Sequence, residues 1–198
     1  MAYYKKLIGE KCYLSPVTME DAEKWTEWFN DLEVALRTGH EAYTPLPLDK
    51  HRELINSYIQ YQENVFTIVD LETNNPIGQC ILYDLVPVDG TAQVSITVGE
   101  KEYWDNGYGY DALTLLLDYG FNLLNLNNIM LRTYSFNERS ISCYKKAGFK
   151  EIGRRRQARV IGRAKYDLVY MDILAEEFVS VFVAPTLARA IGSEPTDR

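Results

Sequence analysis

The sequence predicts one mixed α/β domain, with a central sheet of six to seven strands and helices on both faces. Segments rich in β-branched and aromatic residues alternate with segments whose apolar residues recur at helical spacing. Their order, β-α-α-β-β-β-α-β-α-β-β, joins an antiparallel meander to a later β-α-β-α-β run, which is typical of a mixed sheet. With 198 residues, 46% of them hydrophobic, the chain can form one sizeable core.

The first half of the chain should contain one strand, two helices and then a run of strands. The first strand is expected at residues 11–17, and Thr18 and Asp21 have the spacing of a capping box at the start of a helix. Residues 38–48 are expected to be irregular, and Asp49 to cap the second helix. Further strands are expected at residues 65–69, 77–86 and 92–98.

The second half should alternate helices and strands. We expect a densely apolar helix at residues 112–124, a strand at 128–133, a helix at 137–147, a strand opening at Gly148-Phe149 and a last strand at 164–173. The domain is therefore expected to span residues 1–178, followed by a C-terminal extension at 179–198. The apolar segment 179–185 packs either on its own domain or on a second subunit.

Composition narrows the classes of function. The formal net charge of −7 argues against nucleic acid as the main partner, and the basic run at residues 154–159 is expected to be a solvated strand edge. No apolar stretch approaches the roughly 20 residues of a membrane span, and the N-terminus lacks the apolar core of a signal peptide. Cys12, Cys80 and Cys143 are scattered, which fits reduced thiols in the cytoplasm and neither disulfides nor a metal site.

A glycine-containing turn at residues 103–112 lies between a strand and a helix. Gly107 and Gly109 let the backbone approach an anion closely, where the free N–H groups and dipole of the helix start favour negative charge. The two glycines alone fit a phosphate cradle or a plain turn equally. A dinucleotide-binding fingerprint would need a third glycine at Ala112 and an acidic residue after the next strand, which ends in Thr133. A P-loop lysine is also missing.

Three segments in this order and spacing resemble the GCN5-related N-acetyltransferase (GNAT) superfamily. They are residues 97–113 with the glycine turn, residues 134–149 with its Asn-x6-Tyr-x3-Gly-Phe pattern, and residues 166–178. The nearest branch looks like the RimJ/RimL-like and spermidine acetyltransferases, whose first strand and helix also resemble residues 8–21. The resemblance implies the GNAT fold, with a mostly antiparallel sheet and a splayed central strand pair. It also implies acetyl-CoA as co-substrate.

The resemblance places the coenzyme along the strand before the turn, the turn itself and a later helix. Backbone amides of the turn would hold the pyrophosphate, the strand would pair with the pantetheine arm, and the Val98 amide would lie near the thioester carbonyl. Asn137 would contact the coenzyme, cap its helix, or both. Trp104 replaces a Gln or Arg of the family pattern, and Asn106 a frequent Lys. The expected coenzyme-binding residues are Ile96, Thr97, Val98, Asn106, Gly107, Tyr108, Gly109, Tyr110, Asn137 and Ser140.

The resemblance also implies an acyltransferase reaction. Tyr144 lies where many relatives place the acid that protonates the leaving thiolate, and a phenol of pKa near 10 can do so. The expected acceptor is a primary amine of a peptide N-terminus, a polyamine, an amino sugar or another small amine, which attacks directly in a ternary complex. The protein is expected to be a monomer or homodimer. Gln93 stands where many relatives carry a Glu that can act as the general base. His40, Glu41 and Glu100 remain as candidate bases, and a non-catalytic acyl-CoA-binding module remains the alternative.

Overall fold

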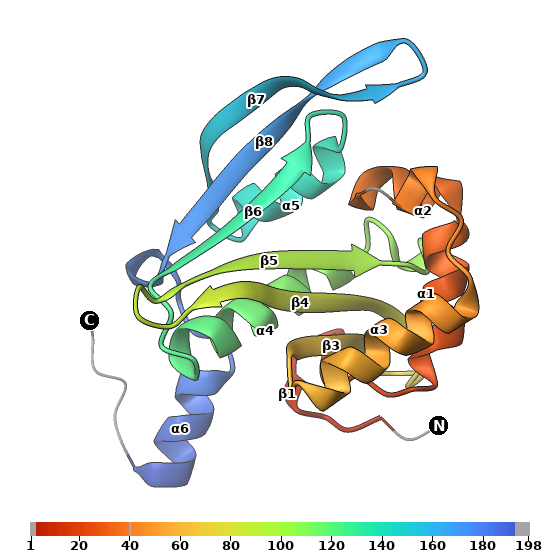
Figure 1. Cartoon of the computed structure of the whole chain (residues 1–198). Helices are drawn as coiled ribbons and strands as arrows, with labels where there is room; N and C mark the ends of the chain where they lie inside the picture. The colour runs from red at the N-terminus through yellow and green to blue at the C-terminus, as the bar shows by residue number, and fades with distance from the viewer. Residues whose placement is uncertain (1–2, 40, 193–198) are drawn as a thin grey trace.

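The computed structural model describes residues 3–39 and 41–192, which form a single sheet with helices on both faces (Figure 1). The strands are β1 Leu7–Ile8, β2 Cys12–Pro16, β3 Asn64–Asp70, β4 Pro76–Val86, β5 Thr91–Val98, β6 Asn128–Tyr134, β7 Lys150–Ile161 and β8 Ala164–Leu174. The helices are α1 Asp21–Asn30, α2 Leu32–Thr38, α3 Leu48–Gln60, α4 Tyr108–Asn122, α5 Glu138–Lys146 and α6 Val183–Ile191. Short 3-10 turns lie at Glu41–Tyr43, Lys101–Tyr103 and Ala175–Glu177.

The sheet confirms the mixed, mostly antiparallel architecture. Its eight strands follow the order β1-β2-β3-β4-β5-β6-β8-β7, and β5 with β6 is the parallel pair. The extra strand relative to the expected six to seven is β1, whose two residues are too short to show an alternating pattern. β5 and β6 pair over residues 91–93 and 128–130 and then diverge, which confirms the splayed central pair (Figure 1).

Each face of the sheet has its own apolar core. Val65 packs with the aromatic residues of α1, whereas its neighbour Phe66 joins the cluster around α4. Successive side chains of a strand point to opposite faces, so α1 to α3 cover one face and α4 the other. Leu113, Leu116 and Leu117 of α4 are completely buried, which explains the dense apolar pattern of this segment. Among the described residues, no helix is both long and apolar enough to span a membrane.

The helices of the N-terminal half differ from the expectations in two places. The carboxylate half of the predicted capping box forms, because Asp21 Oδ2 accepts a hydrogen bond from the backbone N–H of Thr18 at 2.7 Å. Helix α2 was not expected. It is separated from α1 by Asp31, whose backbone is extended and whose side chain accepts a hydrogen bond from the Glu33 N–H at 2.8 Å. The prediction that Asp49 caps α3 is wrong, because the helix already begins at Leu48 and Asp49 lies in its first turn.

The segment after residue 178 is tied to α4 by one buried carboxylate. Asp118 is completely buried and accepts hydrogen bonds from the Ser180 hydroxyl at 2.6 Å and from the backbone N–H groups of residues 181–183 at 2.6–3.0 Å. These N–H groups lie at the start of α6, where a helix lacks its own acceptors. Val183 is 2% exposed and joins the main core. The segment 179–185 therefore packs on its own domain.

The basic run at residues 154–159 lies on β7, the outermost strand of the sheet. The prediction of a solvated edge is wrong for Arg159, which is 4% exposed. Its guanidinium lies over the rings of Tyr43 and Tyr134, at 4.4 and 4.6 Å. The register of β7 and β8 shifts before Arg159, where Gln157 has a φ of 52°. Arg154, Arg155 and Arg156, which precede the end of this irregularity, are exposed, whereas Arg159 after it is buried.

Candidate active site

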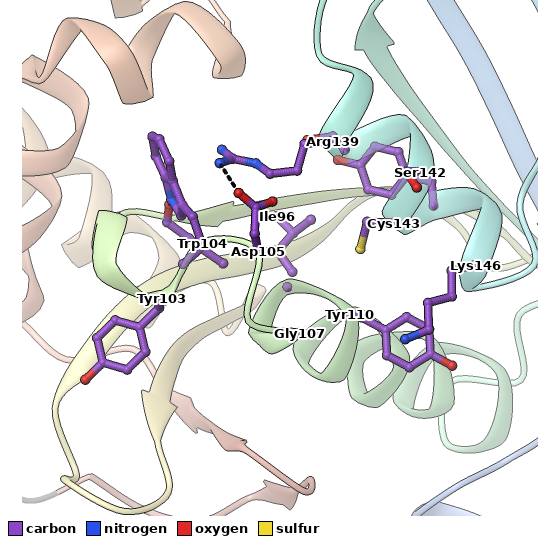
Figure 2. A pocket seen from close by; sticks show the side chains of 14 residues that line it. Ile96, Tyr103, Trp104, Asp105, Gly107, Tyr110, Arg139, Ser142, Cys143 and Lys146 are labelled. Carbon is purple, nitrogen blue, oxygen red and sulfur yellow. Dashed lines mark hydrogen bonds and ion pairs between the residues drawn. The ribbon is translucent and has the colours of Figure 1, made fainter.

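Two cavities meet where β5 separates from β6. The small cavity, of about 370 Å³, is lined by the end of β5, the glycine turn, the start of α4 and helix α5 (Figure 2). The large cavity, of about 710 Å³, is lined by residues of α1 to α3 and of β4 to β6. Ile96 of β5 and Tyr144 of α5 line both cavities. The two cavities are therefore neighbours and share these two side chains as part of their walls.

The glycine turn forms one wall of the small cavity. Gly107 has a φ of 87° and directly precedes α4, and a Cβ atom at this position would lie 3.3 Å from Lys11 Cε. The first backbone N–H groups of a helix lack intrahelical acceptors. In α4 these groups belong to residues 108–110, because the N–H of Asp111 donates to Gly107 O at 3.0 Å. The turn thus presents free N–H groups and the positive end of a helix dipole at the cavity.

Cationic side chains add positive charge to the small cavity. Arg139 lies 4.0 Å from the ring of Trp104 and forms an ion pair with Asp105 at 3.6 Å, as Figure 2 shows. Lys146 lies on the other side, 4.1 Å from the ring of Tyr110. Trp104 is itself fixed by a hydrogen bond from its Nε1 to Val98 O at 2.8 Å. These groups suit a ligand with several negative charges.

Asn137 precedes α5 and is buried, with 5% of its surface exposed. Its side chain makes no capping hydrogen bond, so the expected N-cap contact is absent. Within residues 3–39 and 41–192, its Oδ1 atom has no hydrogen-bond partner. A buried acceptor without a partner costs about 1–3 kcal/mol, so this oxygen is an exception among the buried polar atoms.

Tyr144, like Ile96, lines both cavities. It lies on α5 with 9% of its surface exposed, and Ser140, one helical turn before it, lines the same small cavity. Burial raises the pKa of the Tyr144 phenol well above its usual value, and hydrogen bonding with Ser140 opposes the shift in part. The hydroxyl therefore stays protonated at neutral pH and can donate a proton to an anion that forms beside it.

The ten residues expected at the coenzyme fall into three groups. Those that line the small cavity are Ile96, Val98, Gly107, Gly109, Tyr110 and Ser140. Thr97 lines the large cavity. The other three line neither: Asn106 donates to Glu102 O at 3.0 Å, Tyr108 donates to Asp70 Oδ1 at 3.0 Å, and Asn137 lies buried at the start of α5. Arg139 and Lys146 line the small cavity in addition.

The large cavity is lined by residues of both helices and strands. His51 of α3 is 3% exposed, its Nδ1 lies 3.0 Å from Thr26 Oγ1, and its ring stacks on Phe29 with centroids 5.7 Å apart. Glu63, which lies between α3 and β3, lines the same cavity. Sequence reasoning did not select His51 or Glu63, because no local motif marks either residue.

Gln93, which replaces the glutamate base of many relatives, lines neither cavity. Its Oε1 accepts a hydrogen bond from the Tyr83 hydroxyl at 3.2 Å, and its Nε2 donates to Asp84 Oδ2 at 2.8 Å. Tyr83 does line the large cavity. Gln93 thus orients a tyrosine of the cavity wall and has no acid–base role of its own.

Glu100 also lies outside both cavities. Its Oε1 accepts hydrogen bonds from Lys24 Nζ at 2.8 Å and from Trp28 Nε1 at 3.1 Å, so it connects α1 to the turn after β5. The other two candidate bases are not placed, since His40 and the side chain of Glu41 lie outside the described part of the chain.

Comparisons with known proteins agree with this geometry. The family model of the acetyltransferase (GNAT) domain matches residues 11–150. The uncharacterised N-acetyltransferase p20 of Bacillus licheniformis is 26% identical over 174 residues, which cover 87% of this chain and 97% of that protein. The alpha/beta-tubulin-N-acetyltransferase 9 of Mus musculus is 25% identical over 158 residues, 74% of this chain and 64% of that protein.

Solved structures share the fold. The spermidine N-acetyltransferase from Vibrio cholerae, in complex with CoA and spermine, superposes with a TM-score of 0.76 at 24% identity and covers 84% of this chain and 96% of that chain. A GNAT-family acetyltransferase from Bacillus anthracis superposes with a TM-score of 0.74 at 20% identity, covering 86% and 99%.

Proposed function

The chain belongs to the GNAT family of acetyltransferases, and on that premise we propose that it transfers an acetyl group from acetyl-CoA to a primary amine. The observation that carries the proposal is the pair of cavities that meet at Ile96 and Tyr144. Direct transfer in a ternary complex requires two substrates to touch at one point, with each held in its own site. The two cavities supply this arrangement.

In this proposal the small cavity holds acetyl-CoA. The free N–H groups at the start of α4 bind the pyrophosphate, with Arg139 and Lys146 as countercharges. The pantetheine arm lies along residues 96–98, where the edge of β5 no longer pairs with β6 and offers backbone groups to an extended ligand. Asn137 Oδ1 provides a buried acceptor for a donor group of the coenzyme. The ten expected coenzyme residues remain assigned to this role.

The amine reaches the thioester from the large cavity. It attacks the carbonyl carbon, and the Val98 N–H stabilises the oxyanion. The C–S bond then breaks as Tyr144 gives its proton to the departing thiolate, and the proton that the acetylated nitrogen loses returns to Tyr144 through solvent. Attack requires a neutral amine, and His51 and Glu63 line the cavity from which it approaches. The proton of the amine passes to one of these groups or to water before attack.

The alternative is an acyl-CoA-binding module without catalysis, which Gln93 favours because it stands in place of a base. Calorimetry with acetyl-CoA, combined with thiol release across a panel of amines, separates the two functions. A transferase releases thiol only when a suitable amine is present. Tight binding of acetyl-CoA with no release for any amine would favour the binding module.

The remaining assignments follow from the same domain. We propose that residues 1–178 form the catalytic domain, with residues 179–198 as an extension, and that it acts as a monomer or homodimer. A cytoplasmic location is supported by three free cysteines, Cys12, Cys80 and Cys143.

A further inference from the structure

The charge of the large cavity is opposite to that of the whole protein. The chain has a formal net charge of −7, so acidic residues predominate overall. The cavity wall nevertheless contains Arg37, Lys50 and Arg132, with Glu63 as the carboxylate among its described lining residues. We infer that the acceptor amine carries an anionic group, a carboxylate or a phosphate, that these cations bind. This inference rests on the proposed function, because it names the substrate class of the same site.

Arg132 is the cation best placed for this role. It lies on β6, lines the large cavity and is exposed. Arg132 and Tyr83 line the same cavity. Burial raises the pKa of the Tyr83 phenol, and the charge and hydrogen bonding of Arg132 oppose that shift. Among the described side chains of residues 3–39 and 42–192, it forms no ion pair with a carboxylate. Its planar fork of donors matches a carboxylate or a phosphate.

Arg37 and Lys50 contribute from the helices. Arg37 packs on the ring of Trp104 at 5.2 Å and donates to the Glu33 carbonyl of its own helix. Among the described side chains of residues 3–39 and 42–192, it forms no ion pair with a carboxylate within 4.0 Å, although its charge acts on Glu33. Lys50 is ion-paired with Glu53 at 2.7 Å. We therefore assign the binding of the acceptor's anionic group mainly to Arg132 and Arg37.

A polyamine fits this cavity poorly. Its several ammonium groups need carboxylates, whereas the described wall offers Glu63 against two guanidinium groups without ion pairs. A small molecule with one amine and one anionic group fits better, because its amine can reach Ile96 and Tyr144 while its anion faces the arginines. A volume of about 710 Å³ is within the range of small-molecule sites.

Matched acceptors test the inference. One arm compares amino acids with their carboxamides, a second compares glucosamine with its 6-phosphate, and spermidine serves as the polycationic reference. In at least one arm we expect kcat/KM, measured by thiol release, to be roughly tenfold or more higher for the anionic member. The arm that shows the preference identifies carboxylate or phosphate. Equal or higher kcat/KM for the neutral members or for spermidine would overturn the inference.

Variants locate the anion site. In Arg132→Gln we expect the KM of the preferred anionic acceptor to rise roughly 10- to 100-fold, with the KM for acetyl-CoA unchanged. The KM of its neutral counterpart should change much less, and Arg132→Lys should restore part of the difference. Arg52→Gln on α3, which removes a cation paired with Asp49 outside the cavity, is the matched control. Equal losses for anionic and neutral acceptors in Arg132→Gln would overturn the assignment.

A binding measurement separates this inference from the proposed function. Calorimetry of the CoA-saturated protein with the same acceptor pairs requires no turnover. A preference for the anionic member that is lost in Arg132→Gln would support the inference even if no acetyl transfer occurred. Acetyl transfer without any such preference would support the transferase and overturn the anion site.

Discussion

The two cavities differ in how the chain builds them. The small cavity comes from three short segments, residues 96–98, 103–110 and 139–146, and it offers mainly backbone N–H groups and a helix start. The large cavity collects side chains from seven helices and strands, between Trp25 and Tyr144. A site formed by the backbone of a few contiguous segments can be recognised in the sequence from its glycine pattern. A site formed by side chains from separate elements has no local sequence pattern, so its specificity can be inferred only from the folded structure.

Tyr144 belongs to both cavities, so its loss should have the largest effect. In Tyr144→Phe we expect kcat to fall about 100-fold or more, because the proton donor is lost while the ring and its packing remain. Calorimetry should show nearly unchanged acetyl-CoA affinity. Tyr119→Phe removes a hydroxyl that is hydrogen-bonded to Asn64 at 2.9 Å outside both cavities, and it should retain kcat. An unchanged kcat in Tyr144→Phe would remove the acid role.

Gly107→Val should affect the small cavity alone. A β-branched residue at a φ of 87° is strained by about 1–2 kcal/mol, and its side chain displaces the turn that holds the pyrophosphate. We expect acetyl-CoA affinity, measured by calorimetry, to fall roughly tenfold or more. Gly162→Val, at a φ of 59° in the turn between β7 and β8, imposes a comparable strain away from the cavities. If both variants bind acetyl-CoA equally well, the turn is not the coenzyme site.

Gln93→Glu should have a small effect, because Gln93 lines neither cavity. A glutamate would place a second carboxylate against Asp84, which now accepts from Gln93 Nε2 at 2.8 Å. Since Asp84 is exposed, we expect a loss of at most about 1 kcal/mol in the free energy of unfolding by urea denaturation. The double variant Gln93→Glu/Asp84→Asn should recover the lost free energy of unfolding. A tenfold gain in kcat would contradict the account by showing that a base acts from this position.

The pH profile of kcat should show the smallest change. Tyr144 is active as an acid in its protonated form, and burial raises its pKa above the usual value of about 10. The hydroxyl therefore loses its proton only above this value, and kcat should not decline as the pH rises from 7 to about 10. Steady-state rates across this range test the expectation. A decline centred between about pH 7 and 9 would assign the essential acid to another group.

Local pattern predicted the fold where it extended over a full element. The dense leucines of α4 and the β-branched runs of β3 to β5 identified those elements, whereas β1 has only two residues. Helix α2 was missed because Asp31 separates two helical stretches by a single extended residue. Arg159 was misplaced because a strand irregularity changes which side chains face the protein.

The same distinction applies to the site: residues in contiguous motifs could be predicted, and residues from separate elements could not. Gly107 and Tyr144 lie in segments whose spacing is visible along the chain, and the structure places both at the small cavity. His51 and Arg132 lie on α3 and β6 and come to one cavity only through the topology of the sheet. The cationic character of that cavity is likewise hidden by the acidic composition of the whole chain.

A structure of the protein with bound CoA tests the central claim most directly. The account predicts that the pyrophosphate lies on the N–H groups at the start of α4, and that the thiol reaches the border of the two cavities beside the Tyr144 hydroxyl. The large cavity should remain open to the amine. CoA bound in the large cavity, or a thiol directed away from Tyr144, would contradict the account.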